Sequence, residues 1–160
     1  MNHAVVKPLN KKWMVSFKRE KKLDDYLQVG EPLVNFISTR GVWRKLAINC
    51  SAIECMVIFK HEKLKKKLYI IVRGRGGEYS NFVEALGEVL FLSDRIDSRD
   101  FVGVAFPASM RSLVVNHAKN MSNNWKKMSK NFHCSELFFV GNDGSVEQIP
   151  WMKVLRIKDG

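Results

Sequence analysis

The chain has 160 residues, of which 46% are hydrophobic, and this is enough for one core and excludes disorder along the whole length. Its 27 lysines and arginines outnumber its 16 acidic residues, which gives a net charge of +11. Such a charge favours a polyanionic partner, with nucleic acid before an anionic membrane surface.

The composition also bears on organisation and compartment. An odd number of cysteines, 3 in a chain of this size, argues against a disulfide scaffold and favours a reducing intracellular compartment, cytoplasmic or nucleoid-associated. No apolar run approaches the roughly 18 residues of a membrane span, and residues 1–12 lack the apolar stretch of a signal peptide. We expect a single domain over 1–160, with a core over about 23–149 and a basic N-terminal arm over about 1–22.

The first part of the chain predicts helix before strand. In the arm, Trp13, Val15 and Phe17 alternate with polar residues as in a short strand. Helical spacing runs over residues 23 to about 46, where Gly30 and Pro32 should divide the helix into two pieces and Gly41 should end the second piece. Residues 52–60 and 68–73 are rich in β-formers and predict a hairpin of buried strands, joined by a charged turn at 61–67.

The second part alternates strands with helices. A helix over about 81–92 has Ser80 as its expected N-cap, a buried strand covers 101–106, and one long helix covers 109–130. Residues 136–149 form a hairpin around a turn that contains Asp143 and Gly144, and 151–157 form a short last element. The alternation predicts parallel pairing and an α/β fold, in which a mixed central sheet is flanked by helices.

This order of elements resembles the PD-(D/E)xK superfamily, the restriction-endonuclease-like fold of metal-dependent nucleases, over roughly 23–149. The resemblance rests on an acid near the start of the first hairpin strand, on LYIIVRG in the second strand, on EALGEVLFL in the next helix, on FVGVAFP and on ELFFVGNDGSVEQI. It implies a divalent metal held by an acid on the first strand and by the acid of an acid–x–lysine motif on the second. The metal would activate water against a phosphodiester, and the lysine would position the nucleophile or the phosphate.

The implied motif is incomplete in this chain. Glu54 fits the first acid, but Ile71 stands where the second acid belongs, and Arg73 stands where the lysine belongs. Isoleucine cannot ligate a metal, and arginine is practically never deprotonated. In one interpretation catalysis is lost, and Arg73 shares a strand face with Ile71 and pairs with Glu54 or clamps a phosphate.

In the other interpretation the missing carboxylate comes from the following helix. Glu84 and Glu88 are four residues apart and therefore lie on one helical face, opposite most of the apolar stripe. The candidate catalytic residues are then Glu54, Arg73, Glu84 and Glu88, with the three glutamates as ligands of Mg²⁺ or Mn²⁺. A solvated helix face is the simpler interpretation of the two helical glutamates.

Three basic segments are candidate contacts for phosphate. The turn at 60–67 carries five lysines in eight residues, RGRGG at 73–77 combines arginine forks with flexible glycines, and the long helix carries a stripe of lysines. The candidate residues are Lys63, Lys65, Lys66, Lys67, Arg73, Arg75, Lys119, Lys126, Lys127 and Lys130. The alternative interpretations are a solvated hairpin for the turn at 60–67 and a flexible strand-to-helix turn for RGRGG.

The leading functional hypothesis is a nucleic-acid-binding protein with a nuclease-like fold, a degenerate active site and no cofactor. The alternatives are a metal-dependent DNA or RNA nuclease that uses Mg²⁺ or Mn²⁺, and a non-catalytic interaction or assembly subunit. DNA is favoured over RNA as the partner, no membrane is expected, and a homodimer stays open. The cysteines do not have the spacing of a zinc site.

Overall fold

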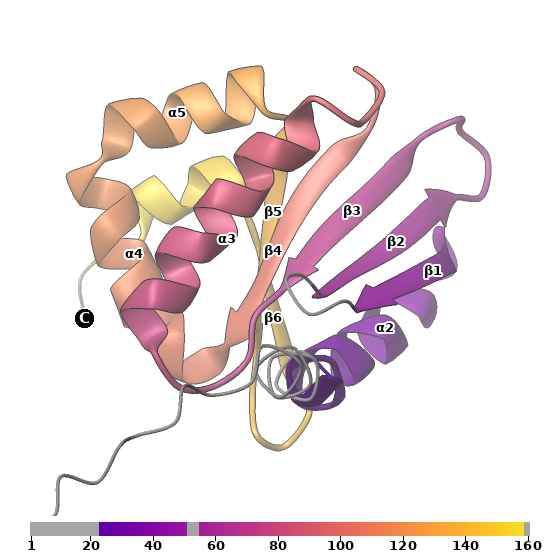
Figure 1. The fold of residues 1–160 in the computed structure, drawn as a ribbon, viewed down its shortest axis with the longest axis horizontal. Helices are drawn as coiled ribbons and strands as arrows, with labels where there is room; N and C mark the ends of the chain where they lie inside the picture. The colour runs from indigo at the N-terminus through magenta and orange to yellow at the C-terminus, as the bar shows by residue number, and fades with distance from the viewer. Residues whose placement is uncertain (1–22, 51–54, 159–160) are drawn as a thin grey trace, which may run out of the picture.

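A computed structural model describes residues 23–50 and 55–158 (Figure 1). The helical elements are η1 (Tyr26–Gly30), α2 (Glu31–Ser38), α3 (Glu78–Ser93), η2 (Ala108–Met110), α4 (Arg111–Asn120), α5 (Ser122–Asn131) and η3 (Trp151–Arg156). The strands are β1 (Trp43–Cys50), β2 (Cys55–His61), β3 (Lys67–Val72), β4 (Phe101–Pro107), β5 (Cys134–Val140) and β6 (Val146–Pro150). The expected strand in the arm, and Glu54, lie outside the described residues.

The six strands form one mixed sheet in the order β1-β2-β3-β4-β5-β6. β1, β2 and β3 are antiparallel, β3, β4 and β5 are parallel, and β6 returns antiparallel to β5. The parallel pairs follow from the helical crossovers between their strands, because a parallel neighbour cannot be reached by a tight turn. The predicted mixed sheet, its parallel pairs and both hairpins are confirmed.

Helices cover both faces of the sheet (Figure 1). On one face α3, α4, α5 and η3 share a core with alternate strand residues such as Ile71, Val104 and Phe139. On the other face η1 and α2 pack against the intervening residues, such as Ile70, Val72 and Phe138. A strand segment whose two sides are both covered is expected to be apolar, and residues 70–72 of β3, 102–107 of β4 and 137–140 of β5 are buried apolar runs of this kind.

The second helical piece ends at Ser38, close to the expected end at Gly41, but the sequence did not predict β1, which follows it and forms an edge strand of the sheet. The six inner residues of β1 are exposed, so the strand has no buried face that would give it an alternating pattern. The register with β2 slips between Lys45 and Ala47. Charged side chains and a bulge on an edge strand both discourage pairing with another chain.

The helical segment before β1 also differs from the prediction of two pieces. Gly30 keeps a right-handed helical conformation, and the N–H of Glu31 donates to the carbonyl of Tyr26, five residues back. Pro32 follows in the first turn of α2. A proline has no N–H to donate, and the wider π-helical turn before it lets the helix continue.

Two later helix boundaries are corrections as well. α3 begins earlier than expected, after Gly77 in a left-handed conformation, and Ser80 lies inside the helix instead of capping it. The expected long helix is divided at Met121, whose φ of −111° and ψ of 33° are not helical. Poor helix formers flank this break at Asn116, Asn120, Asn123 and Asn124, and they lower the cost of interrupting the helix.

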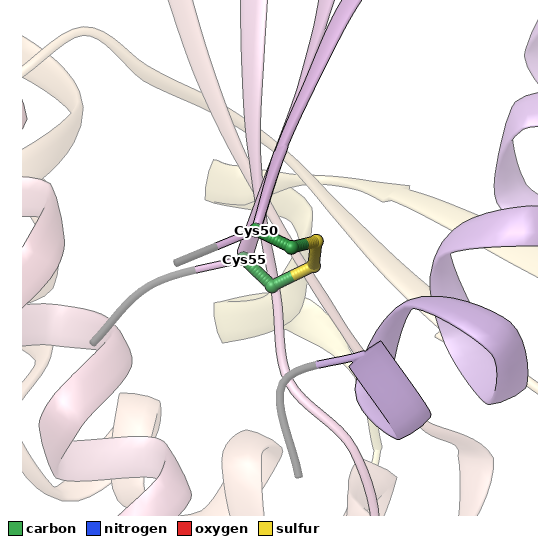
Figure 2. Close-up of a disulfide and its surroundings, with 2 residues drawn as sticks. All are labelled: Cys50 and Cys55. Carbon is green, nitrogen blue, oxygen red and sulfur yellow. A yellow bond between two sulfur atoms is a disulfide. The ribbon is translucent and has the colours of Figure 1, made fainter. Parts of the chain in front are cut away.

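Cys50 and Cys55 form a disulfide between β1 and β2, directly opposite one another in the ladder (Figure 2). The sequence did not predict this disulfide. A single disulfide is not a scaffold of several, which is what the odd number of cysteines argues against. Cys134 is a buried thiol whose pKa is raised to about 12 by desolvation. Among the described residues no helix has the length and apolarity to cross a bilayer.

A pair of tryptophans fastens η3 to α5 beneath the first face of the sheet. The rings of Trp125 and Trp151 stack with centroids 3.8 Å apart, and both side chains are buried. Trp125 Nε1 donates to the Trp151 carbonyl at 2.9 Å, and Trp151 Nε1 donates to the Trp125 carbonyl at 3.0 Å. Each indole therefore has its N–H satisfied although it lies out of water.

We expect Trp125→Ala to lower the free energy of unfolding by about 3–5 kcal/mol, because it removes a large buried ring and leaves a cavity and an unpaired carbonyl. The matched control is Trp43→Ala, at a half-buried position on the edge strand, which should cost clearly less. Urea denaturation of both variants measures the difference. Equal costs would contradict the role given to the tryptophan pair.

Candidate functional site

The candidate site lies at the end of the sheet where the central strands β3 and β4 finish. Arg73 follows the last residue of β3, and its backbone N–H donates to the Ala105 carbonyl at 2.9 Å, which extends the parallel ladder by one step. Ile71 packs in the core on the α3 side, so Arg73, two residues later, points to the same side. The prediction that Ile71 and Arg73 share a face of the strand is confirmed.

The guanidinium of Arg73 is held by α3. The side chain is only 1% exposed, Nη1 lies 3.2 Å from Glu84 Oε2, and Nη2 donates to Glu88 Oε1. The two glutamates differ in environment, because the side chain of Glu84 is 59% exposed and that of Glu88 is 19% exposed. Glu84 and Glu88 are thus ion-pair partners of a buried cation and not simply a solvated helix face.

This arrangement determines the charge of the site. An isolated guanidinium is costly to bury, and two carboxylates at hydrogen-bonding distance offset that cost. Arg73 Nε and Nη1 are both buried without a hydrogen-bond partner among the described residues, so the guanidinium donates a hydrogen bond to Glu88 through Nη2 and meets Glu84 only as an ion pair. The site is a buried cation between two carboxylates of α3.

The metal ligands inferred from the sequence are therefore only partly assembled. Glu84 and Glu88 converge, but on Arg73, and Glu54 lies outside the described residues. Over 23–50 and 55–158 no group of three or more His, Cys, Asp or Glu side chains is placed to hold a metal ion. Arg73 is also closed off from solvent, so in this conformation its guanidinium cannot reach a backbone phosphate.

The glycine-rich loop after Arg73 is fastened rather than loose. The buried Asn81 of α3 donates from Nδ2 to the carbonyls of Gly74 at 3.0 Å and Gly76 at 2.6 Å. Gly76 and Gly77 have positive φ values of 82° and 60°, which side-chain-bearing residues rarely adopt. Gly74 faces the buried Asp25, whose Oδ1 would lie 1.9 Å from a Cβ at this position, so only glycine fits.

Arg75 is the exposed arginine of this loop. Its Nη2 donates to Asn142 Oδ1 in the turn between β5 and β6, and this contact joins the two turns at the same end of the sheet. Arg75 is therefore the arginine of RGRGG that a phosphate could approach, whereas the Arg73 side chain is buried in its ion pairs with Glu84 and Glu88.

The basic turn, defined as residues 61–67, lies at the opposite end of the sheet. It joins the end of β2 to the start of β3, while the candidate site follows the end of β3 (Figure 1). β3 has six residues, which at roughly 3.3 Å each separates the two features by about 20 Å. A single phosphate cannot contact both, contrary to what their closeness in sequence suggested.

The backbone of the basic turn has a defined shape. The N–H groups of Lys63 and Leu64 donate to His61 Nδ1, both at 3.1 Å, and the Lys67 N–H donates to Asp100 Oδ1 at 2.8 Å. Lys63 and Lys65 are exposed, and Lys66 and Lys67 are half-buried. None of the ion pairs found between described residues uses a lysine of this turn.

The lysines of the expected long helix fall on both sides of the break at Met121. Lys119 lies near the end of α4, and Lys126, Lys127 and Lys130 lie on α5, the last three exposed. α5 and the basic turn lie toward the same end of the sheet, where β3 and β4 begin (Figure 1). Figure 1 also shows that α5 and the basic turn lie on different sides of the molecule at that end, so the candidate phosphate contacts there form two separate groups, and Arg73 and Arg75 lie at the other end of β3.

The chain was compared with protein families, curated proteins and solved structures. No family model, no curated protein and no solved structure matches the chain.

The two glutamates should contribute unequally to stability, because they differ in exposure. We expect Glu88→Gln to lower the free energy of unfolding by about 3–5 kcal/mol, since it leaves a buried guanidinium short of charge compensation. Glu84→Gln, the matched control on the exposed partner, should cost roughly 0–1 kcal/mol. Chemical denaturation measures both values.

The same ion pairs predict a rescue. In an Arg73→Met background the cation is gone, so Glu88→Gln should become nearly neutral, and the coupling energy of this double-mutant cycle should be about as large as the Glu88→Gln effect itself. A Glu88→Gln cost that persists without Arg73 would show that Glu88 acts through other contacts.

Proposed function

We propose that this chain is a nucleic-acid-binding protein with a nuclease-like fold and a degenerate active site. The observation that carries the binding proposal is the basic turn, a fixed loop with lysines that enter no ion pair between described residues, in a chain of net charge +11. Exposed lysines of this kind attract a phosphate backbone by releasing its condensed counterions, and they need no base contacts to do so.

The nuclease-like fold is proposed from the order of elements. The hairpin β2–β3, then α3, β4, the α4–α5 pair and the hairpin β5–β6 occur in the order on which the resemblance to the PD-(D/E)xK superfamily was drawn. β1 adds an edge strand that the resemblance did not include. In this proposal the site at the end of β3 corresponds to the place of the family's metal centre.

The degenerate state of the site is supported by its charge. Ile71 supplies no ligand, and the guanidinium of Arg73 already satisfies the carboxylates of Glu84 and Glu88. A divalent cation would have to bind beside this fixed positive charge, and the repulsion between the two cations opposes it. Arg73 then stabilises the site in place of a metal.

A second function is favoured by one specific observation. Two carboxylates from α3 converge on a single point, and Glu84 remains 59% exposed there. If Arg73 withdraws and Glu54 joins these two glutamates, the three acids would form a site for Mg²⁺ or Mn²⁺, and the protein would be a metal-dependent nuclease of DNA or RNA.

The binding proposal predicts a salt dependence that is carried by the basic turn. With about five phosphate contacts on a duplex, the slope of log affinity against log salt should be roughly −4 to −5. Neutralising Lys65, Lys66 and Lys67 together should reduce that slope by up to about three times 0.9. Fluorescence anisotropy with a labelled duplex over a salt series measures the slope.

The control for this measurement is an equal loss of charge elsewhere. Lys45, Lys153 and Lys158 are exposed and lie outside the proposed surface. Their triple glutamine variant should keep the slope nearly unchanged. Equal slopes in the two triple variants would place the binding surface elsewhere, and an absence of binding to DNA and RNA at low salt would favour an interaction or assembly subunit.

The degenerate site predicts no cleavage. Wild-type protein incubated with Mg²⁺ or Mn²⁺ and a panel of linear, branched and single-stranded substrates should bind them and leave them intact, because no group of three or more His, Cys, Asp or Glu side chains among the described residues is placed to hold a metal ion. Metal-dependent cleavage that disappears in Glu54→Ala and in Glu88→Ala would establish the nuclease instead. The salt slope would be unaffected by that result.

A further inference from the structure

A cavity lies at the corner between α4, α5 and η3, away from the Arg73 site. Its volume is about 450 Å³, within the roughly 300–1,000 Å³ of small-molecule sites. Six described residues line it: Lys119, Ser122, Lys126, Met152, Leu155 and Arg156. Neither the degenerate site nor the basic turn accounts for this cavity.

The lining has the chemistry of an anion site with an apolar side. Three cations come from three different elements, α4, α5 and η3, and Ser122 adds a hydroxyl that can donate. No carboxylate occurs among the described lining residues, and no aspartate or glutamate occurs over 101–135. Met152 and Leu155 contribute an apolar wall, which a bare inorganic anion would leave unused.

The cavity is held in shape by the tryptophan pair. Lys126 follows Trp125 on α5 and Met152 follows Trp151 on η3, so the stacked indoles and their two reciprocal hydrogen bonds fix these two walls relative to each other. The third wall depends on the break at Met121, because it places Lys119 and Ser122 at the corner between two helices rather than along one straight helix. A site whose walls are fixed before binding pays less entropy when the ligand arrives.

We propose that this cavity binds a nucleoside phosphate, with the phosphate on Lys126 and Arg156 and the nucleoside against Met152 and Leu155. Arginine offers a two-pronged donor to phosphate and lysine offers a mobile point charge, and the apolar wall matches the flat face of a base. A free nucleotide and the phosphorylated end of a strand share this chemistry. The strand-end form rests on the proposed nucleic-acid binding, whereas the free-nucleotide form does not.

The test is a calorimetric titration at low salt, with AMP and adenosine as a pair that differs only in the phosphate. We expect AMP to bind and adenosine to bind at least about tenfold more weakly, the effect of losing a charge-assisted contact. Lys126→Gln and Arg156→Gln should each weaken AMP binding by a similar factor. Both side chains are exposed, so these variants should fold normally.

Two controls separate this cavity from the proposed nucleic-acid surface. Lys127→Gln, next in sequence on α5 but not in the lining, should leave AMP binding unchanged, as should the triple variant of Lys65, Lys66 and Lys67. Binding of a 5′-phosphorylated oligonucleotide is compared with binding of its 5′-hydroxyl form, which tests whether the ligand is the phosphorylated end of a strand. Preference for the phosphorylated oligonucleotide that Arg156→Gln removes, without AMP binding, would identify the strand end as the ligand.

The proposal is overturned if neither AMP nor the 5′-phosphate contributes to binding, if adenosine binds as well as AMP, or if Lys127→Gln weakens AMP as much as Lys126→Gln does. A failure of the nucleic-acid proposal would look different, because it would remove the salt-dependent binding of duplex and leave AMP binding in place.

Discussion

The ion pairs of Arg73 with Glu84 and Glu88 are the constraint on which the site depends. They place a permanent cation inside the fold at the end of β3, and they turn two carboxylates of α3 inward to meet it. The charges of Arg73, Glu84 and Glu88 therefore largely compensate one another at this end of the sheet.

The fold separates this compensated end from the surplus positive charge. The basic turn and α5 lie toward the end of the sheet where β3 and β4 begin, and the glycine loop and the Arg73 site lie at the end where they finish (Figure 1). A protein that cleaved nucleic acid would need its phosphate contacts to converge on the reacting atoms. Here the lysines lie elsewhere, which supports binding without cleavage as the proposed function.

The sequence predicted most of the sheet and less of the site. The strands β2, β3, β4 and β5 were found because burial makes them continuous apolar runs, whereas β1 is exposed on both faces and has no such signal. Arg73 and the two glutamates are candidate residues from the sequence and lie together in the structure, but strand spacing alone could not show that α3 supplies the ion-pair partners of Arg73. No signal in the sequence points to Asn81, whose side chain binds the glycine-rich loop, because a single asparagine in a helix forms no pattern. The cavity at α4, α5 and η3 could not be predicted either, because it depends on the break between α4 and α5, and the spacing of the lysines there is that of one continuous helix.

The central claim is that Arg73 takes the place of a metal between Glu84 and Glu88. The most direct measurement is anomalous scattering from crystals soaked in Mn²⁺, for the wild type and for Arg73→Ala. We expect no manganese peak at these carboxylates in the wild type, and a peak in Arg73→Ala, where the two acids have lost their cation. A manganese ion bound by Glu84 and Glu88 in the wild type, with Arg73 displaced, would contradict the claim.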